Sequence, residues 1–267
     1  MKTVYCEKKM WHIVAASIIL ILVSPMRGRR ADNRKTQANV TVDISKTIDV
    51  NDYAVGFSLD HDWRDFLYSS DSRQLASDAD FKLVRVVDFR SSLRPCTRWY
   101  ESSKTGSFNW ADLDALVQRI FEVGAEPLIV LGAFTGYGRN PIIPSGMSIN
   151  PSTRLPYPES FAAYCAEWVK HFKSKGMPVK FYEIMNEAWY YFWDGWDRTN
   201  TAKRRNYVAL LNTVYDSMRG VDNNVLIGTD SSTLRSFLDY FVNNGRGLGF
   251  SSLHHHESRS NRDSDSQ

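Results

Sequence analysis

Short apolar runs alternate with longer amphipathic segments along most of the chain. The runs are rich in β-branched and aromatic residues and are bounded by Gly, Pro, Asn or Asp, which is typical of buried strands. The predicted strands are residues 54–59, 81–87, 126–131, 179–185, 225–229 and 249–256, preceded by a strand or hairpin over 40–50. Between them, apolar residues recur at helical spacing. The predicted helices are residues 72–79, 110–123, 158–175, 201–219 and 234–243.

This alternation of strand and helix predicts parallel strands joined by crossover helices. No Gly-x-Gly-x-x-Gly or Walker sequence follows a predicted strand, which disfavours a nucleotide-binding open sheet. The sequence therefore predicts an α/β fold of the (β/α)8 TIM-barrel type, with only about the first six βα units present. Residues 40–256 are expected to form this incomplete barrel, and the polar residues 257–267 a tail.

The first 30 residues have a different composition. Three lysines precede the apolar run 11–23 and three arginines follow it, which is the layout of a signal peptide. A spanning helix needs about 20 apolar residues, so a cleaved signal peptide is favoured, with an N-terminal membrane anchor through residues 11–23 as the alternative. Both predict a secreted or membrane-anchored extracellular protein. Residues 1–30 hold six Lys/Arg and one Glu, a net of +5, while the whole chain carries +3. The remaining residues are therefore mildly acidic, which gives no support to a nucleic-acid partner.

The strand predicted over 179–185 ends in the polar pair Asn186 and Glu187, and a strongly aromatic segment with Trp189 and Trp193 follows. In parallel barrels, polar residues at strand ends usually belong to the site. A carboxylic acid beside flat apolar rings suits a sugar, because the C–H faces of a sugar stack on rings and its glycosidic oxygen needs a proton source. The alternatives are a hydrophobic strand followed by an aromatic plug, or aromatic side chains that cap the barrel mouth.

Polar side chains also stand at the ends of other predicted strands. The whole set is Asp60, His61, Asp88, Arg90, Asn186, Glu187, Asp230 and His254. The strands of a parallel barrel all end at one rim, so these polar side chains are expected to lie near one another. That grouping favours a site at the rim. His61 is a candidate for substrate binding, and surface solvation explains it nearly as well. Neighbouring strand residues point to opposite faces, so at most His254 and His256 share a side, which is too few ligands for a metal site. No metal and no cofactor are expected.

Three of these segments together resemble clan A of the glycoside hydrolases, which are retaining (β/α)8 enzymes that include β-xylosidases and α-L-iduronidases. The sequence Phe-Tyr-Glu-Ile-Met-Asn-Glu over 181–187 resembles the acid/base strand of that clan. Leu-Val-Arg-Val-Val over 83–87 resembles its second strand, and Ser-Leu-His-His-His over 252–256 its sixth. The β-xylosidase and iduronidase branch is the nearest, and the resemblance covers about residues 50–256.

The resemblance implies a role for each matching residue. Glu187 would be the general acid/base, and Asn186 would bind the sugar 2-hydroxyl. Arg85 would orient the nucleophilic carboxylate, and His254 would line the subsite at the cleaved bond. The expected partner is a glycoside, an oligosaccharide or a polysaccharide. His256 stands where the clan commonly has Tyr, which puts the hydroxyl partner of the nucleophile in doubt.

The resemblance also implies a nucleophilic Glu at the end of a seventh strand, and this sequence ends after the sixth. Glu183 is a poor substitute, because four residues of extended strand place it about 13 Å from Glu187. Retaining chemistry needs the two carboxyl groups about 5–5.5 Å apart. We therefore expect Glu183 to be a barrel-interior residue paired with Arg85, and the chain to be an inactive or barely active fragment of a longer glycosidase. The alternatives are a catalytically dead carbohydrate-binding barrel and a barrel enzyme of another chemistry.

Overall fold

The computed structural model describes residues 56–59, 63–87, 93–134, 141–188, 191, 201–230, 235–247 and 249–252. The chain divides into two compact units, Met1–Asp49 and Val50–Gln267, and every described residue belongs to the second. The predicted leader, the strand predicted over 40–50 and the polar tail lie outside the described residues. No helix in the described part of the chain has the length and apolar character needed to cross a membrane.

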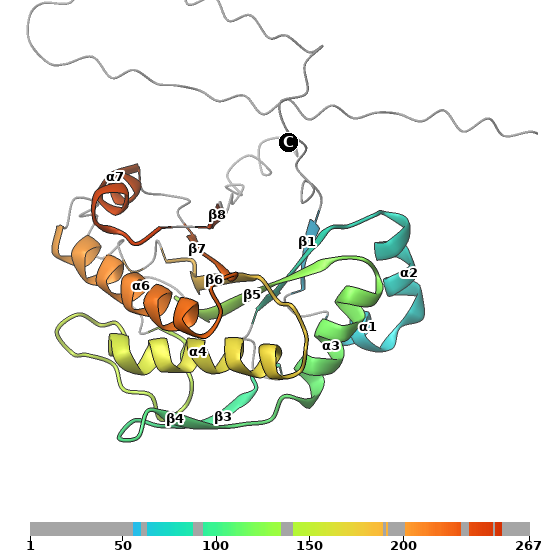
Figure 1. The fold of residues 1–267 in the computed structure, drawn as a ribbon, viewed down its shortest axis with the longest axis horizontal. Coiled ribbons are helices and arrows are strands. Elements are labelled where there is room, and N and C mark those ends of the chain that lie inside the picture. The colour runs from blue at the N-terminus through green and yellow to red at the C-terminus, as the bar shows by residue number, and fades with distance from the viewer. Residues whose placement is uncertain are drawn as a thin grey trace, which may run out of the picture. The chain divides into compact units, whose positions relative to one another are not determined.

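Six parallel strands form the main sheet, in the same order as in the sequence (Figure 1). They are β1 (Gly56–Leu59), β2 (Leu83–Val87), β5 (Glu126–Ala133), β6 (Phe181–Asn186), β7 (Leu226–Asp230) and β8 (Phe250–Ser252). Each falls within, or within two residues of, a run predicted from the sequence. The prediction of parallel strands joined by crossover helices is thus confirmed.

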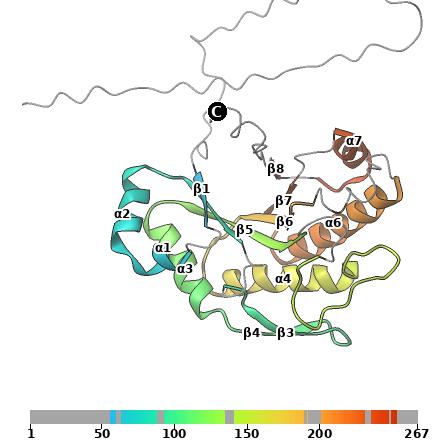
Figure 2. The same ribbon diagram turned by 180° about the vertical axis from the view of Figure 1, so that it is seen from behind.

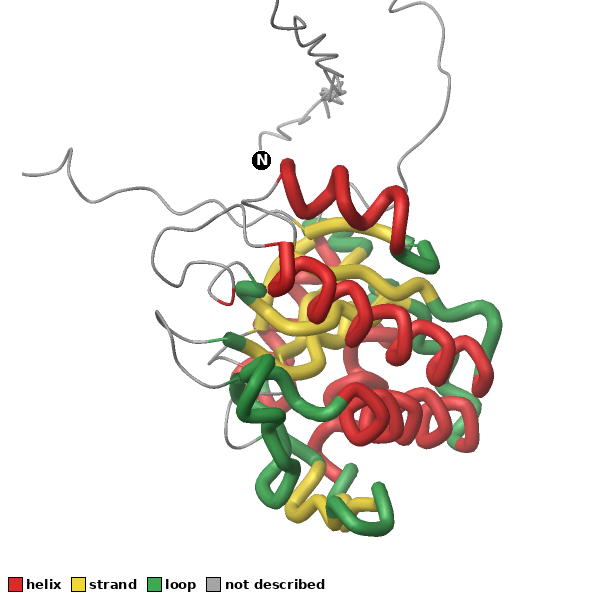
Figure 3. The backbone as a smooth tube through the Cα atoms, turned by 90° about the vertical axis from the view of Figure 1, so that its left-hand side faces the viewer, coloured by secondary structure: helices red, strands yellow, loops and turns green. Residues whose placement is uncertain are grey.

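The helices lie along one side of this sheet, as Figures 1 and 3 show. They are α1 (Trp63–Tyr68), α2 (Ser70–Asp78), α3 (Ala111–Glu122), α4 (Pro158–Ser174), α6 (Thr201–Val221) and α7 (Arg235–Asn244). Five of these were predicted to within a few residues. Helix α1 was missed, because its six residues are too few for a helical repeat of apolar positions to be recognised.

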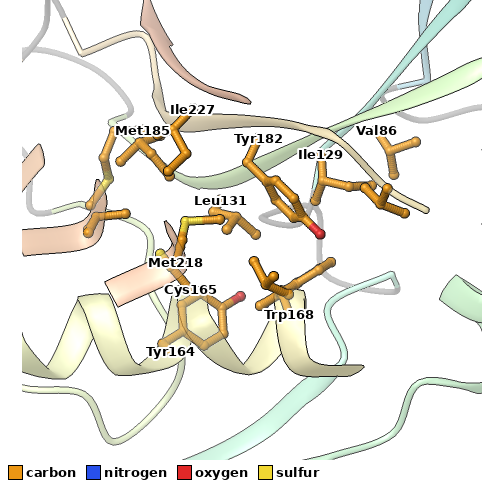
Figure 4. Packing of buried hydrophobic residues seen from close by; sticks show 14 of the residues in the cluster. Val86, Ile129, Leu131, Tyr164, Cys165, Trp168, Tyr182, Met185, Met218 and Ile227 are labelled. Atoms are coloured by element: carbon orange, nitrogen blue, oxygen red, sulfur yellow. The ribbon is translucent and has the colours of Figure 1, made fainter. Parts of the chain in front are cut away.

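Side chains alternate between the two faces of the sheet, as expected for strands. We call the residues packed between the strands and the helices the outer core; they include Val86, Ile129, Leu131, Tyr182 and Ile227 (Figure 4). We call the apolar cluster on the opposite face the inner core; it consists of Val87, Leu128, Val130, Ala133 and Phe181, with Leu83, Ile142, Leu226 and Phe250 against it. The inner core contains no helical residue, so it lies on the side that becomes the interior of a barrel.

An antiparallel hairpin was not predicted from the sequence. It consists of β3 (Cys96–Tyr100) and β4 (Thr105–Phe108). Helix α4 lies between this hairpin and the main sheet in both Figures 1 and 2. Tyr164 of α4 contacts Trp99 edge-on at 6.0 Å and stacks on Phe108 at 6.4 Å between ring centroids. Both strands are largely exposed and β4 contains Gly and Ser, so no apolar alternation marks them in the sequence.

Candidate active site

Arg85 of β2 and Glu183 of β6 form an ion pair on the inner face of the sheet. The Nε and Nη2 atoms of Arg85 donate to the two carboxylate oxygens of Glu183 at 3.0 and 2.8 Å. Glu183 is fully buried, whereas the Arg85 side chain is 20% exposed. Two parallel charge-assisted hydrogen bonds fix the plane of the guanidinium. The expectation that Glu183 is an interior residue paired with Arg85 is confirmed.

The same guanidinium also holds the side chain of Asn186. Nη2 of Arg85 donates to Oδ1 of Asn186 at 2.6 Å, and Asn186 is 7% exposed. A guanidinium can only donate, so the amide oxygen must face it. The amide nitrogen is therefore directed away from Arg85, and it presents its two N–H donors on the other side. A donor fixed in this way at the end of a barrel strand suits a ligand hydroxyl.

In a strictly alternating strand Glu183 and Asn186 would lie on opposite faces, because they are three positions apart. The structure differs, since both side chains reach the same guanidinium. The cause is Met185, whose φ of 61° is left-handed. Ile184 and Met185 both belong to the outer core, and Figure 4 shows Met185 near Ile227 there. Two consecutive side chains, those of Ile184 and Met185, thus lie on the outer face, and Asn186 after them lies on the inner face.

The neighbouring strand β5 also departs from strict alternation of its side chains at this level. Leu131 belongs to the outer core and Ala133 to the inner core, so Gly132 between them takes the extra position. Gly132 has a φ of 73°, and a Cβ added to it would lie 2.9 Å from the Met185 sulfur. Pairing of the strands continues on both sides of this level, since Leu131 pairs with Ile184 and Ala133 with Asn186. Because each strand has one extra residue at this level, the register between β5 and β6 is the same on both sides of it.

Glu187 follows Asn186 directly at the point where β6 ends. It is partly exposed, and its φ of 54° is also left-handed. The chain before it is held by a hydrogen bond from the Phe134 N–H to the Asn186 carbonyl oxygen at 2.8 Å. Glu187 thus stands on an anchored strand end beside the fixed amide of Asn186. The 13 Å separation of Glu183 and Glu187 assumed a regular strand, so it does not apply beyond Met185.

Tyr191 is the described residue of the aromatic segment that follows Glu187. It is 7% exposed and packs against Phe134 and Tyr207, at 5.6 and 6.1 Å between ring centroids. Burial raises the pKa of its phenol to about 12. Lys203 donates to the Tyr191 carbonyl oxygen at 3.1 Å. Tyr191 is therefore part of the outer core.

The remaining predicted site residues fall outside the described part of the chain. These are His61, Trp189, Trp193 and His254, together with Asp60, Asp88, Arg90 and the side chain of Asp230. Of the predicted set, the structure brings together Arg85 and Asn186, with Glu187 next in the chain. In the described ranges, no group of three His, Cys, Asp or Glu side chains is placed to hold a metal ion.

The sequence prediction missed Gly132 and Met185 as residues that shape this rim. A glycine inside a strand pattern often marks a bulge, so Gly132 carried a signal. It was instead assigned to the loop after the third predicted strand. Met185 carried no signal, because a methionine in a hydrophobic strand gives no indication of a left-handed backbone.

No family model matches the sequence, and no curated protein matches it. Solved structures of similar fold do exist. One is a monomeric β-xylosidase from Caulobacter crescentus CB15, with a TM-score of 0.54 and 17% identity over 76% of this chain and 41% of that one. A GH39 enzyme from Xanthomonas axonopodis pv. citri has a TM-score of 0.53 and 16% identity over 76% of this chain and 40% of that one.

A GH39 β-xylosidase from Caulobacter crescentus gives a TM-score of 0.52 and 15% identity, over 76% of this chain and 46% of that one. The described part of this chain shares the fold of these glycosidase structures. Identity below 20% shows the fold alone. The chain spans less than half the length of each of these three proteins. The predicted fold class, a (β/α) barrel that is present in part, is confirmed.

Proposed function

We propose that the end of β6 is the acid/base half of a retaining glycoside hydrolase site. The observation that supports it best is the orientation of Asn186. Its amide oxygen is held by Arg85, so its amide nitrogen is set to donate, and Glu187 is the next residue. An amide donor beside a partly exposed carboxyl group, on a strand end of a glycosidase-type barrel, matches what the resemblance implied for these two positions.

In this proposal Glu187 moves the proton in both steps. As the acid it protonates the glycosidic oxygen while the bond from that oxygen to the sugar breaks, and as the base it then takes a proton from the attacking water. Asn186 donates to the 2-hydroxyl of the sugar, a contact that strengthens as the ring becomes oxocarbenium-like. Arg85 does not need to touch the sugar, because its hydrogen bonds already orient Asn186.

The retaining mechanism also requires a second carboxylate, which forms the covalent bond to the sugar. Glu183 does not suit this role, because it is fully buried and both of its oxygens accept from Arg85. We propose that the nucleophile comes from outside the described residues, on a seventh strand as in clan A. A second candidate function is a carbohydrate-binding barrel without catalysis. The pairing of both Glu183 oxygens with Arg85 favours it, because Glu183 is then not available as a nucleophile.

The proposed substrate is a glycoside, an oligosaccharide or a polysaccharide. Two of the three similar structures are named as β-xylosidases, so 4-nitrophenyl β-D-xyloside is the first probe. The corresponding glucoside, mannoside and glucuronide complete a panel. Release of 4-nitrophenol reports hydrolysis, and saturation-transfer difference NMR reports binding whether or not the glycoside is cleaved.

The test compares the wild type with Glu187→Gln and Asn186→Ala. We expect the wild type to bind at least one glycoside, and Glu187→Gln to bind it with a Kd within about threefold, because the amide keeps the shape of the acid. Asn186→Ala should weaken binding about tenfold, the value of one hydrogen bond. Hydrolysis by the wild type that Glu187→Gln abolishes separates an enzyme from a binding barrel. The proposal fails if no glycoside in the panel binds.

A further inference from the structure

Two buried hydroxyl groups hold the peptide that precedes Met185. The Thr229 hydroxyl on β7 donates to the carbonyl oxygen of Ile184 at 3.0 Å. The Tyr207 hydroxyl on α6 lies 3.2 Å from the same carbonyl oxygen and 2.7 Å from the Thr229 oxygen. Ile184, Tyr207 and Thr229 are all fully buried. The three oxygens thus form a closed triangle that is shielded from solvent.

This triangle lies directly before the residue at which the alternation of β6 shifts. The carbonyl oxygen of Ile184 belongs to the peptide that links Ile184 to Met185, so its direction helps to set the backbone of Met185. A left-handed methionine is less stable than one in the ordinary conformation, and neighbouring contacts must compensate for it. Hydrogen bonds to that carbonyl from two other elements supply such contacts.

We propose that Tyr207 and Thr229 are positioning residues for the site at the end of β6. Their hydroxyl groups hold the Ile184 carbonyl in the direction that keeps Met185 left-handed. That conformation turns Asn186 toward Arg85 and sets Glu187 on the rim. The role in glycoside recognition rests on the proposed function, whereas the effect on the orientation of Asn186 does not.

A purely structural role is the competing explanation. Any buried hydroxyl that loses its partners lowers stability, whether or not it acts on the site. The two explanations differ in what happens to Asn186. If Tyr207 only joins α6 to the sheet, its hydroxyl can be removed without a change at the Asn186 amide. If Tyr207 positions the strand end, the contact between Asn186 and Arg85 must change.

The test uses Tyr207→Phe, with Tyr182→Phe as the matched control. Tyr182 is on β6, the strand that carries Ile184 and Asn186; it is fully buried, and its hydroxyl has no hydrogen-bond partner among the described residues. Both variants remove one buried hydroxyl, and only Tyr207→Phe touches the triangle. In 15N-labelled full-length chain, the side-chain NH2 signal of Asn186 is assigned by its loss in Asn186→Ala. Glycoside binding is measured in the same samples with the panel above.

We expect Tyr207→Phe to shift the Asn186 side-chain signal and to weaken glycoside binding about tenfold, while Tyr182→Phe changes neither. An unshifted Asn186 signal in a folded Tyr207→Phe overturns the inference and leaves the proposed function standing. If the wild type binds no glycoside, the proposed function fails, and the Asn186 signal still decides the positioning role.

A second pair of variants covers the case in which Tyr207→Phe does not fold. Thr229→Val removes the other hydroxyl of the triangle with little change of shape, and Thr229→Ser keeps it. We expect Thr229→Val to shift the Asn186 signal as Tyr207→Phe does, and Thr229→Ser to keep it at the wild-type position. Equal spectra for the Val and Ser variants would contradict the inference.

Discussion

Gly132 on β5 and Met185 on β6 lie side by side in the sheet, and both have left-handed backbones, with φ of 73° and 61°. At this level each of the two strands contains one residue more than strict alternation of side chains allows. The pairing of β5 with β6 therefore continues past this level, from Leu131 and Ile184 to Ala133 and Asn186. The end of β6 is turned so that the Asn186 amide accepts a hydrogen bond from Arg85, and the proposed site at this rim depends on that contact.

Gly132→Ala should destabilise the protein by about 2–5 kcal/mol. The new methyl group takes a disfavoured φ, which costs about 1–2 kcal/mol, and also meets the Met185 sulfur at 2.9 Å, where overpacking adds about 1–3 kcal/mol. Urea unfolding measures the loss. Gly176→Ala is the control, because Gly176 has a φ of 68° and nothing within 4 Å of an added Cβ. Equal losses for the two variants would show that the contact with Met185 is unimportant.

Arg85→Met should cost about 3–5 kcal/mol, because it leaves the fully buried Glu183 carboxylate without its cation. The double variant Arg85→Met/Glu183→Leu should recover part of that loss, since neither charge is then buried alone. Arg119→Met breaks an exposed pair with Glu122 and should cost less than about 1 kcal/mol. Denaturant midpoints of the three variants provide the measurement. A double variant no more stable than Arg85→Met would contradict this account.

Alkaline pH should destabilise the fold through two buried phenols. Burial raises the pKa of Tyr182, and it raises the pKa of Tyr191 to about 12, whereas an unfolded tyrosine ionises near 10. The folded state therefore retains protons that the unfolded state loses. The contribution of Tyr191 is fully present below about pH 10 and is lost as pH rises from there toward about 12.

Unfolding free energies at pH 9 and pH 11 test this point. The wild type should lose more stability over that interval than the double variant Tyr182→Phe/Tyr191→Phe, in which neither group can ionise. The comparison between the two proteins cancels the titration of lysines that they share. Parallel pH profiles for the two proteins would mean that these phenols are not protected by the fold.

Much of the scaffold follows from simple periodicity in the sequence. The apolar runs that became β2, β5, β6 and β7 and the helical repeats that became α3 and α4 are long enough to be recognised. The pair of Arg85 with Glu183 was also predicted, as the alternative to a nucleophilic role for Glu183. The sequence placed Asn186 and Glu187 at a strand end, which the structure confirms.

The detailed arrangement of the rim was not predictable in the same way. The period-two rule assigns Asn186 to the face opposite Glu183, and the left-handed Met185 reverses that assignment. Nothing in the residue type of Met185 signals this conformation. It arises from tertiary contacts, namely the neighbouring shift at Gly132 and the buried hydroxyls of Tyr207 and Thr229. Local sequence rules do not contain contacts between residues that lie 23 or 45 positions apart, as these hydroxyl groups and Ile184 do.

The most direct test of the account is a titration of the full-length chain with 4-nitrophenyl β-D-xyloside and the other glycosides of the panel, followed by saturation-transfer difference NMR. Wild type, Glu187→Gln and Asn186→Ala are compared, with circular dichroism to confirm that each is folded. The account predicts that the wild type and Glu187→Gln bind the same glycoside with similar Kd, and that Asn186→Ala binds it about tenfold more weakly. Binding that is unchanged in Asn186→Ala, or no binding by the wild type to any glycoside tested, would contradict it.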